Sequence, residues 1–254
     1  MKVRLDKLLV QNGVVSSRER AQALILAGRV LVNEQKIEKA GAAVPKDAAI
    51  RVLGEELRYV SRGGLKLEHA LDHWEIDLSR RSCVDIGTST GGFTDCMLQH
   101  GAAEVIAVDT GYGQIAARLR SDPRVKLLEK TNARYLTAER LAKAGGSSGA
   151  ISFIAVDVSF ISATLVLPAV LKAAFWSSDL RVQRAIVVLI KPQFEVGRGL
   201  VGKGGIVKDE QARESAVLKV AQKVAALGGQ HIELMESPIL GMEGNKEFLL
   251  RADF

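Results

Sequence analysis

The chain has 254 residues, of which 47% are hydrophobic and 25% are charged, a composition typical of an ordinary globular protein. Its longest uncharged apolar stretch, residues 158–171, contains Pro168 and is too short to span a bilayer as a helix. Residues 1–4 are already polar, with no signal peptide before them, so we expect a cytoplasmic protein and no membrane partner. Cys83 and Cys96 fall in apolar stretches and are expected to be buried, reduced thiols rather than metal ligands.

The net charge of +6 is unevenly distributed along the chain. Residues 1–64 carry 12 Lys or Arg against 7 Asp or Glu, whereas the remaining residues carry 23 against 22. This asymmetry predicts an N-terminal module that binds a polyanion, although a solvated helical face would give a milder version of the same pattern.

The first 53 residues predict a small mixed module. Apolar residues at helical spacing indicate helices over residues 4–11 and 18–27, the second capped by Ser16 and Ser17, and residues 30–32 and 49–52 read as short strands. The motifs RLDKLL (4–9), SR (17–18) and AGRVLVN (27–33) resemble an S4 RNA-binding domain. That resemblance implies RNA contacts by basic residues; an unrelated helical module with merely solvated arginines is the alternative. The candidate RNA-binding residues are Arg4, Lys7, Arg18, Arg20, Arg29 and Arg62.

From residue 80 onward the pattern alternates strand and helix, which predicts a parallel sheet with helices on both faces. The fold class is therefore α/β, a methyltransferase-type doubly wound seven-stranded sheet that follows a small N-terminal α+β domain. We expect the S4-like domain over residues 1–60, a linker and first catalytic-domain helix over 61–79, and the methyltransferase domain over 80–254. The expected strands are residues 83–86, 105–108, 125–128, 151–156, 185–190, 231–235 and 248–252. Residues 193–207 hold five glycines and are expected to form a mobile loop.

The motif VDIGTSTGGFTD (84–95) places an acid and a glycine-rich turn directly after a short strand. Glycines let the backbone approach a ligand, and Asp109 ends the next apolar run about 20 residues beyond the turn, where an acid can accept bonds from ribose hydroxyls. A dinucleotide fingerprint and a P-loop both fail on spacing. Because Asp85 would repel a pyrophosphate, the turn favours the positively charged S-adenosylmethionine. The candidate cofactor residues are Asp85, Gly87, Ser89, Gly91, Gly92, Asp109 and Asn132.

Two charged residues follow predicted strands directly, Asp157 and Lys191, where ligands bind in open α/β sheets. With Lys66 and Glu247 they resemble the Lys-Asp-Lys-Glu tetrad of ribose 2′-O-methyltransferases. The motifs DVSFIS (157–162), KPQFE (191–195) and GYGQ (111–114) are more narrowly similar to the TlyA family, historically labelled hemolysins. The resemblance implies Lys66, Asp157, Lys191 and Glu247 as catalytic residues and adds Asn132 to the cofactor shell.

The chemistry suits these residue types. A ribose hydroxyl needs a base to remove its proton, and a lysine beside another cation can be that base. We take Lys191 as the base and Lys66 as its neighbouring cation, which also orients the ribose, with Asp157 and Glu247 orienting the ammonium groups. No Asp/Asn-Pro-Pro-Tyr run typical of enzymes that methylate exocyclic amines is present, so ribose is preferred over base.

The family implies an rRNA (cytidine-2′-O)-methyltransferase that acts on ribosomal RNA or a ribosomal subunit. The end of the chain at Phe254 resembles the shorter family form associated with large-subunit rRNA. Two alternatives remain: a membrane-lytic hemolysin, and an RNA-binding assembly factor whose methyltransferase half is inactive. The sequence does not indicate the oligomeric state.

Overall fold

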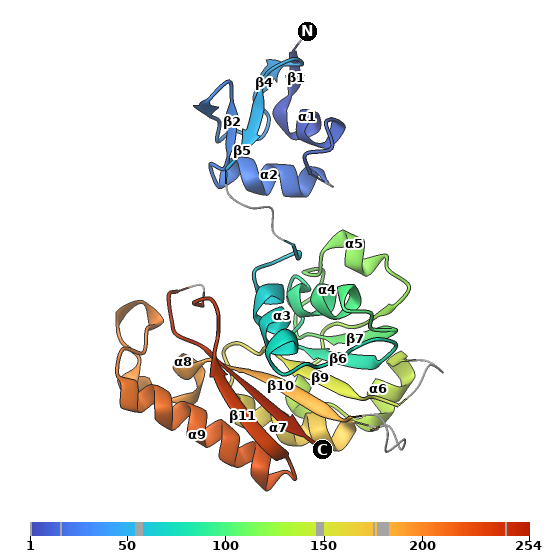
Figure 1. The fold of residues 1–254 in the computed structure, drawn as a ribbon, viewed down its shortest axis with the longest axis vertical. Helices are drawn as coiled ribbons and strands as arrows, with labels where there is room; N and C mark the ends of the chain where they lie inside the picture. Colours follow the sequence, from blue (N-terminus) through green and yellow to red (C-terminus); the bar gives the residue numbers. More distant parts are fainter. Residues whose placement is uncertain are drawn as a thin grey trace. The chain divides into compact units, whose positions relative to one another are not determined.

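The computed structural model describes residues 2–15, 17–53, 58–145, 150–174, 176, 183–241 and 243–254. The chain divides into two compact units, Met1–Glu56 and Leu57–Phe254 (Figure 1). Tyr59 is 1% exposed and belongs to the core of the second unit. The domain limits predicted from the sequence remain a prediction, and the packing of Tyr59 favours a start of the catalytic unit before residue 60.

The N-terminal unit packs two helices against short strands. Its elements are β1 (Lys2–Arg4), α1 (Leu5–Gln11), α2 (Arg18–Leu26), β2 (Val30–Val32), β3 (Gln35–Lys36), β4 (Ala43–Pro45) and β5 (Ile50–Val52). Ser17 caps α2 as predicted, its Oγ accepting from Arg20 N at 3.2 Å, whereas Ser16 lies outside the described residues. Strand β2 pairs with β3 and β5, and β1 pairs with β4. The pairing of β1 with β4 was not predicted, because each of these strands is flanked by exposed residues around a single central valine and so lacks the apolar run that marks β2.

The second unit is built on a seven-stranded sheet. The strands are β6 (Ser82–Ile86), β7 (Glu104–Val108), β8 (Val125–Leu128), β9 (Phe153–Val156), β10 (Ala185–Ile190), β11 (Gln230–Glu236) and β12 (Phe248–Asp253), in the spatial order β11-β12-β10-β9-β6-β7-β8. β6 to β10 run parallel, and β12 is antiparallel to both of its neighbours. The seven strands confirm the predicted α/β sheet, with ends displaced by one or two residues.

Helices cover both faces of this sheet. They are α3 (Gly63–His73), α4 (Gly92–Gln99), α5 (Ala117–Arg120), α6 (Ala138–Gly145), α7 (Ala163–Ala173), α8 (Pro192–Glu195) and α9 (Glu210–Ala226), with the 3-10 turns η1 (Ala133–Tyr135), η2 (Arg198–Leu200) and η3 (Lys203–Gly205). Residues 193–207, predicted as one mobile loop, contain the end of α8 and the 3-10 turns η2 and η3. Helix α8 begins at Pro192, a residue that suits the first turn of a helix.

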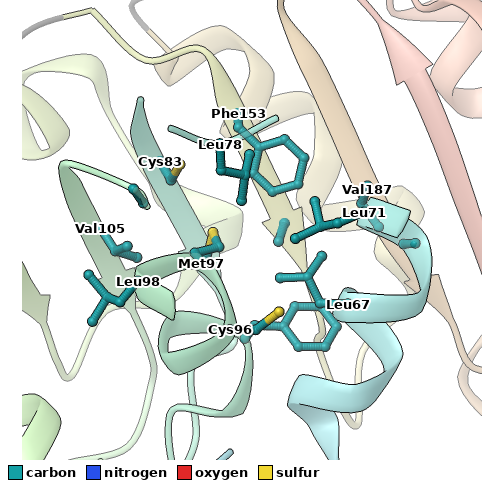
Figure 2. Close-up of a cluster of buried hydrophobic side chains, with 14 of the residues drawn as sticks. Leu67, Leu71, Leu78, Cys83, Cys96, Met97, Leu98, Val105, Phe153 and Val187 are labelled. Carbon is teal, nitrogen blue, oxygen red and sulfur yellow. The ribbon is translucent and has the colours of Figure 1, made fainter. Parts of the chain in front are cut away.

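Successive residues of the central strands enter opposite cores, as the period of a strand requires. In β10, Val187 packs with α3 and α4, whereas Val188 packs with α7 and α9. Figure 2 shows the first of these cores, where Leu67 and Leu71 of α3 meet Met97 of α4 over the sheet. Both strand faces are buried, which explains why the parallel strands read as continuous apolar runs.

The strand order reverses direction at β6, which lies between β7 and β9. In sheets of this kind the crossover helices diverge to opposite faces at such a point and leave a crevice at the carboxyl ends of the strands. Asp85, Asp109 and Asp157 all lie at this carboxyl-terminal end of the sheet, in or just after β6, β7 and β9.

Candidate active site

The glycine-rich turn after β6 requires its glycines. Gly87 has a φ of +89°, and a Cβ built there would lie 2.2 Å from the carbonyl oxygen of Asp157. Gly91, with a φ of +98°, caps α4 in the left-handed region that favours glycine. The turn thus brings the backbone of β6 directly against the end of β9, and no side chain fits between them.

Asp85 lies fully buried beneath this turn. Its Oδ2 accepts from Thr94 Oγ1 at 2.6 Å, while its Oδ1, also buried, has no hydrogen-bond partner among the described residues. Burial raises the pKa of Asp85 to about 7, and the nearby charges of Asp157 and Asp109 add to the effect. A buried carboxyl with one unpartnered oxygen is suited to a ligand that brings a hydrogen-bond donor or a positive charge.

Asp109 anchors the other end of the turn. Its Oδ2 accepts from Ser89 N at 2.7 Å, and its Oδ1 accepts from Gly111 N at 2.6 Å. A small pocket opens here, lined by Ser89 of the turn, by Asp109 and residues near it after β7, and by Leu127 of β8. Asn132 is exposed, and its Oδ1 accepts from Arg134 N at 3.0 Å, so its side chain caps η1.

The four predicted catalytic residues form two ion pairs. Lys191 Nζ lies 2.5 Å from Asp157 Oδ1, close enough for an ion pair but outside hydrogen-bond geometry, and donates to Ser159 Oγ at 2.8 Å. Lys66 Nζ donates to Glu247 Oε2. All four side chains are between 3% and 21% exposed. Each lysine is held by one of the two acids expected to orient the ammonium groups, Lys66 by Glu247 and Lys191 by Asp157, whereas the expected effect of Lys66 on Lys191 stays a prediction.

Strand register brings the two pairs to the same edge. Ile190 of β10 pairs with Phe248 of antiparallel β12, so Lys191, which follows Ile190, and Glu247, which precedes Phe248, leave the sheet side by side. Lys66 comes from the first turn of α3. Residues far apart in the chain therefore meet because an antiparallel last strand begins where its parallel neighbour ends.

Three supporting residues were not singled out from the sequence. Thr94 hydrogen-bonds Asp85, and Ser159 hydrogen-bonds Lys191. Asn245 is 1% exposed and contacts the loop of residues 193–207. The side chain of Asn245 accepts from Val207 N at 2.9 Å and donates to the Gly205 carbonyl at 2.8 Å. Ser159 and Asn245 each stand two residues from a tetrad member, a spacing that could have drawn attention to them.

The predicted RNA-binding residues are mostly solvent-facing. Lys7 and Arg62 are exposed, and Arg62 precedes Lys66 by about one helical turn. Arg29 Nε donates to the Leu53 carbonyl at 2.7 Å. Arg4 and Arg18 are half exposed and both contact the buried carboxylate of Asp6, which the sequence did not single out.

Comparison with known proteins places both units. The model of the FtsJ-like methyltransferases matches residues 59–254, and that of the S4 domain matches residues 3–50. The chain is 44% identical to the 16S/23S rRNA (cytidine-2′-O)-methyltransferase TlyA of Mycobacterium tuberculosis, over 98% of this chain and 89% of that protein. This chain belongs to the TlyA group of FtsJ-like methyltransferases.

Other relatives of the TlyA group carry a hemolysin name. Hemolysin A of Brachyspira hyodysenteriae is 39% identical over 97% of this chain and 98% of its own. A solved structure from Streptococcus thermophilus, titled as a hemolysin, superposes with a TM-score of 0.73 at 40% identity and covers 99% of this chain and 88% of its own. Within the described parts of this TlyA-group chain, no helix is long and apolar enough to cross a membrane.

Proposed function

We propose that this chain is an S-adenosylmethionine-dependent rRNA (cytidine-2′-O)-methyltransferase that acts in the cytoplasm. The observation that carries the proposal is the pairing of Lys66 with Glu247 and of Lys191 with Asp157 at the edge of the sheet where the Asp85 turn lies. The rRNA substrate is proposed by analogy with the named activity of the Mycobacterium tuberculosis relative.

The residues around the glycine-rich turn fit the cofactor. Asp85 offers a buried carboxylate oxygen with no partner among the residues that the structure describes, which suits a donor or cationic group of S-adenosylmethionine better than a phosphate. Asp109 would accept from ribose hydroxyls, since each carboxylate oxygen has more than one lone pair, and Gly87, Ser89, Gly91 and Gly92 would let the backbone approach. Asn132 is proposed as part of the shell on the family resemblance. The bound cofactor supplies an electrophilic methyl group.

The tetrad would prepare the ribose. Lys191, in its neutral form, takes the proton of the 2′-hydroxyl, and Asp157 stabilises the ammonium that results. Ser159 fixes the direction of Lys191 Nζ. Lys66, held by Glu247, orients the ribose oxygen, and the remaining rate comes from holding the two reactants in line.

The N-terminal unit would bind ribosomal RNA or a ribosomal subunit through its basic side chains. Phosphate contacts by Lys and Arg supply salt-dependent affinity and fix the register of the protein on the RNA. The residues proposed for this role are Arg4, Lys7, Arg18, Arg20 and Arg29, and Arg62 of the second unit is proposed to add a further RNA contact.

The test is methyl transfer to rRNA from a strain that lacks the gene. Purified protein with tritium-labelled S-adenosylmethionine is expected to label one ribose, and mapping the labelled nucleotide would identify the subunit. Cofactor binding without transfer to RNA or subunits would instead favour the inactive assembly factor. Leakage from liposomes in parallel would support the hemolysin name.

A further inference from the structure

Asp6 in α1 is the most heavily hydrogen-bonded side chain described in the N-terminal unit. Its carboxylate is completely buried and accepts five hydrogen bonds. Arg4 Nε and Lys7 N reach Oδ1 at 3.0 and 2.9 Å. Arg4 Nη2 and Arg18 Nη2 reach Oδ2 at 2.9 Å, and Gln22 Nε2 reaches it at 3.0 Å. These contacts use the full accepting capacity of a carboxylate.

The two arginines that contact Asp6 are also partly exposed to solvent. The Arg4 side chain is 49% exposed and that of Arg18 is 47% exposed. Their contacts with Asp6 use two of the five N–H donors of Arg4 and one of those of Arg18. Two cations therefore share one oxygen of a buried anion, Asp6 Oδ2, and keep further N–H donors with which to bind a second anion.

We propose that Asp6 is a positioning residue that holds Arg4 and Arg18 as a fixed guanidinium pair for an RNA phosphate. A long side chain that is already immobilised loses less conformational entropy on binding, and a planar guanidinium matches the geometry of phosphate oxygens. The inference rests on the proposed role of the N-terminal unit in binding rRNA, and it assigns the acid, not only the arginines, to that role.

The proposal makes a prediction opposite in sign to simple electrostatics. Removing a negative charge from a basic module should tighten its binding to a polyanion. If Asp6 positions the arginines, Asp6→Asn should weaken binding instead, because a neutral amide cannot hold both guanidinium groups. Glu34 offers a matched control, since it pairs with Arg51 on the surface of the same unit, where their side chains are 69% and 58% exposed.

The experiment measures the affinity of the full chain for a fluorescently labelled RNA stem-loop by anisotropy over a series of salt concentrations. Asp6→Asn is expected to bind about three- to tenfold more weakly and to reduce the slope of log affinity against log salt by about one, the value of one lost phosphate contact. Glu34→Gln is expected to bind as tightly as the unmodified protein or more tightly. Circular dichroism and S-adenosylmethionine affinity report whether each variant is folded.

A second variant keeps the test decisive if Asp6→Asn does not fold. Arg4→Lys with Arg18→Lys preserves the net charge but removes the guanidinium groups, and it is expected to weaken binding by a similar factor. A folded Asp6→Asn protein that binds as tightly as Glu34→Gln, or a double lysine variant with unchanged affinity, overturns the inference. If Arg4→Ala with Arg18→Ala also leaves the RNA affinity unchanged, the proposed role of this unit's basic surface in RNA binding is wrong as well, and not only the role of Asp6.

Discussion

The two units of the chain use charged residues in opposite ways. In the second unit Lys66 bonds Glu247 across 181 positions of sequence, and both side chains are at most 10% exposed. In the N-terminal unit Asp6 bonds arginines 2 and 12 positions away, and those arginines are half exposed. The proposed orientation of a reacting group by Lys66 calls for a pair shielded from water, and here distant segments supply it, whereas the proposed phosphate binding calls for charge that reaches the surface, and here residues near in sequence supply it.

This difference predicts how the two units respond to substitution. A buried pair that acts on the reacting atoms should lose nearly all activity when one member changes, because the remaining charge has no substitute partner. A surface with several cations should lose affinity in steps, one phosphate contact at a time.

The largest effect is expected at Lys191. Lys191→Ala should slow single-turnover methylation of rRNA by about 10² to 10⁴, because a general base acts in the transition state, while the affinities for S-adenosylmethionine and RNA stay nearly unchanged. Lys191→Arg should fail too, since a guanidinium keeps its proton near neutral pH. A Lys191→Arg enzyme running at the unmodified rate would move the role of base to Lys66.

A smaller loss is expected when the N-terminal unit is removed. A chain that begins at Leu57 retains Tyr59 in its core and should still bind S-adenosylmethionine. Its affinity for rRNA should fall by about ten- to a hundredfold at low salt, with a shallower salt dependence, because several phosphate contacts are lost. Fluorescence anisotropy over a salt series measures both quantities. Equal affinity and slope in the two chains would show that the basic module has no part in RNA binding.

A loss of cofactor affinity is expected at the glycine-rich turn. Asp85→Ala or Asp109→Ala should weaken S-adenosylmethionine binding by about 1 to 3 kcal/mol, the cost of leaving a buried polar partner unsatisfied. Isothermal titration calorimetry measures this directly. Glu236→Ala, which removes an exposed acid of β11, is the control and should bind the cofactor normally. Unchanged affinity in both aspartate variants would contradict the proposed cofactor site.

The smallest effect is a change in how stability depends on pH. The pKa of Asp85 is raised to about 7 in the folded, cofactor-free protein. As pH rises from about 4, the Asp85 carboxyl therefore ionises in the unfolded chain before it ionises in the folded one. Asp85 therefore lowers stability progressively up to pH 7, and the loss is complete above that value. Asp85→Asn removes this titration, so its stability relative to the unmodified protein should rise by about 1 to 2 kcal/mol between pH 5 and pH 6.5. Urea unfolding at the two pH values tests it; a pH-independent difference would show that Asp85 does not titrate in this range.

The sequence by itself determined much of this protein. Runs such as Ala185–Ile190 are buried on both faces and are therefore continuously apolar, so the central strands of the sheet could be recognised. The outer strand β11 is mostly exposed and was recognised only from its place in the alternation of strands and helices. The turn with Gly87 was recognisable because its conformation excludes any other residue. The four proposed catalytic residues were selected from the sequence through their resemblance to a family as well as from positions after strands; the structure brings them together as two ion pairs, and their catalytic role stays a prediction.

Only the tertiary structure decided which charges meet. Lys66 and Lys191 are the same residue type in the sequence, and the register of β10 on β12 places Lys191 beside Glu247, yet in the folded chain Lys66 of α3 pairs with Glu247 and Lys191 pairs with Asp157. In the sequence, Asp6 resembles any other polar residue of an amphipathic helix. In the structure, α2 packs against α1 and places Arg18 against the buried carboxylate of Asp6. Local sequence determines which backbone conformation a segment adopts, but the partner of a buried charge depends on how segments pack together, whether the partner is 12 positions away, as for Asp6, or 181, as for Glu247, since burial itself is a property of the packed fold.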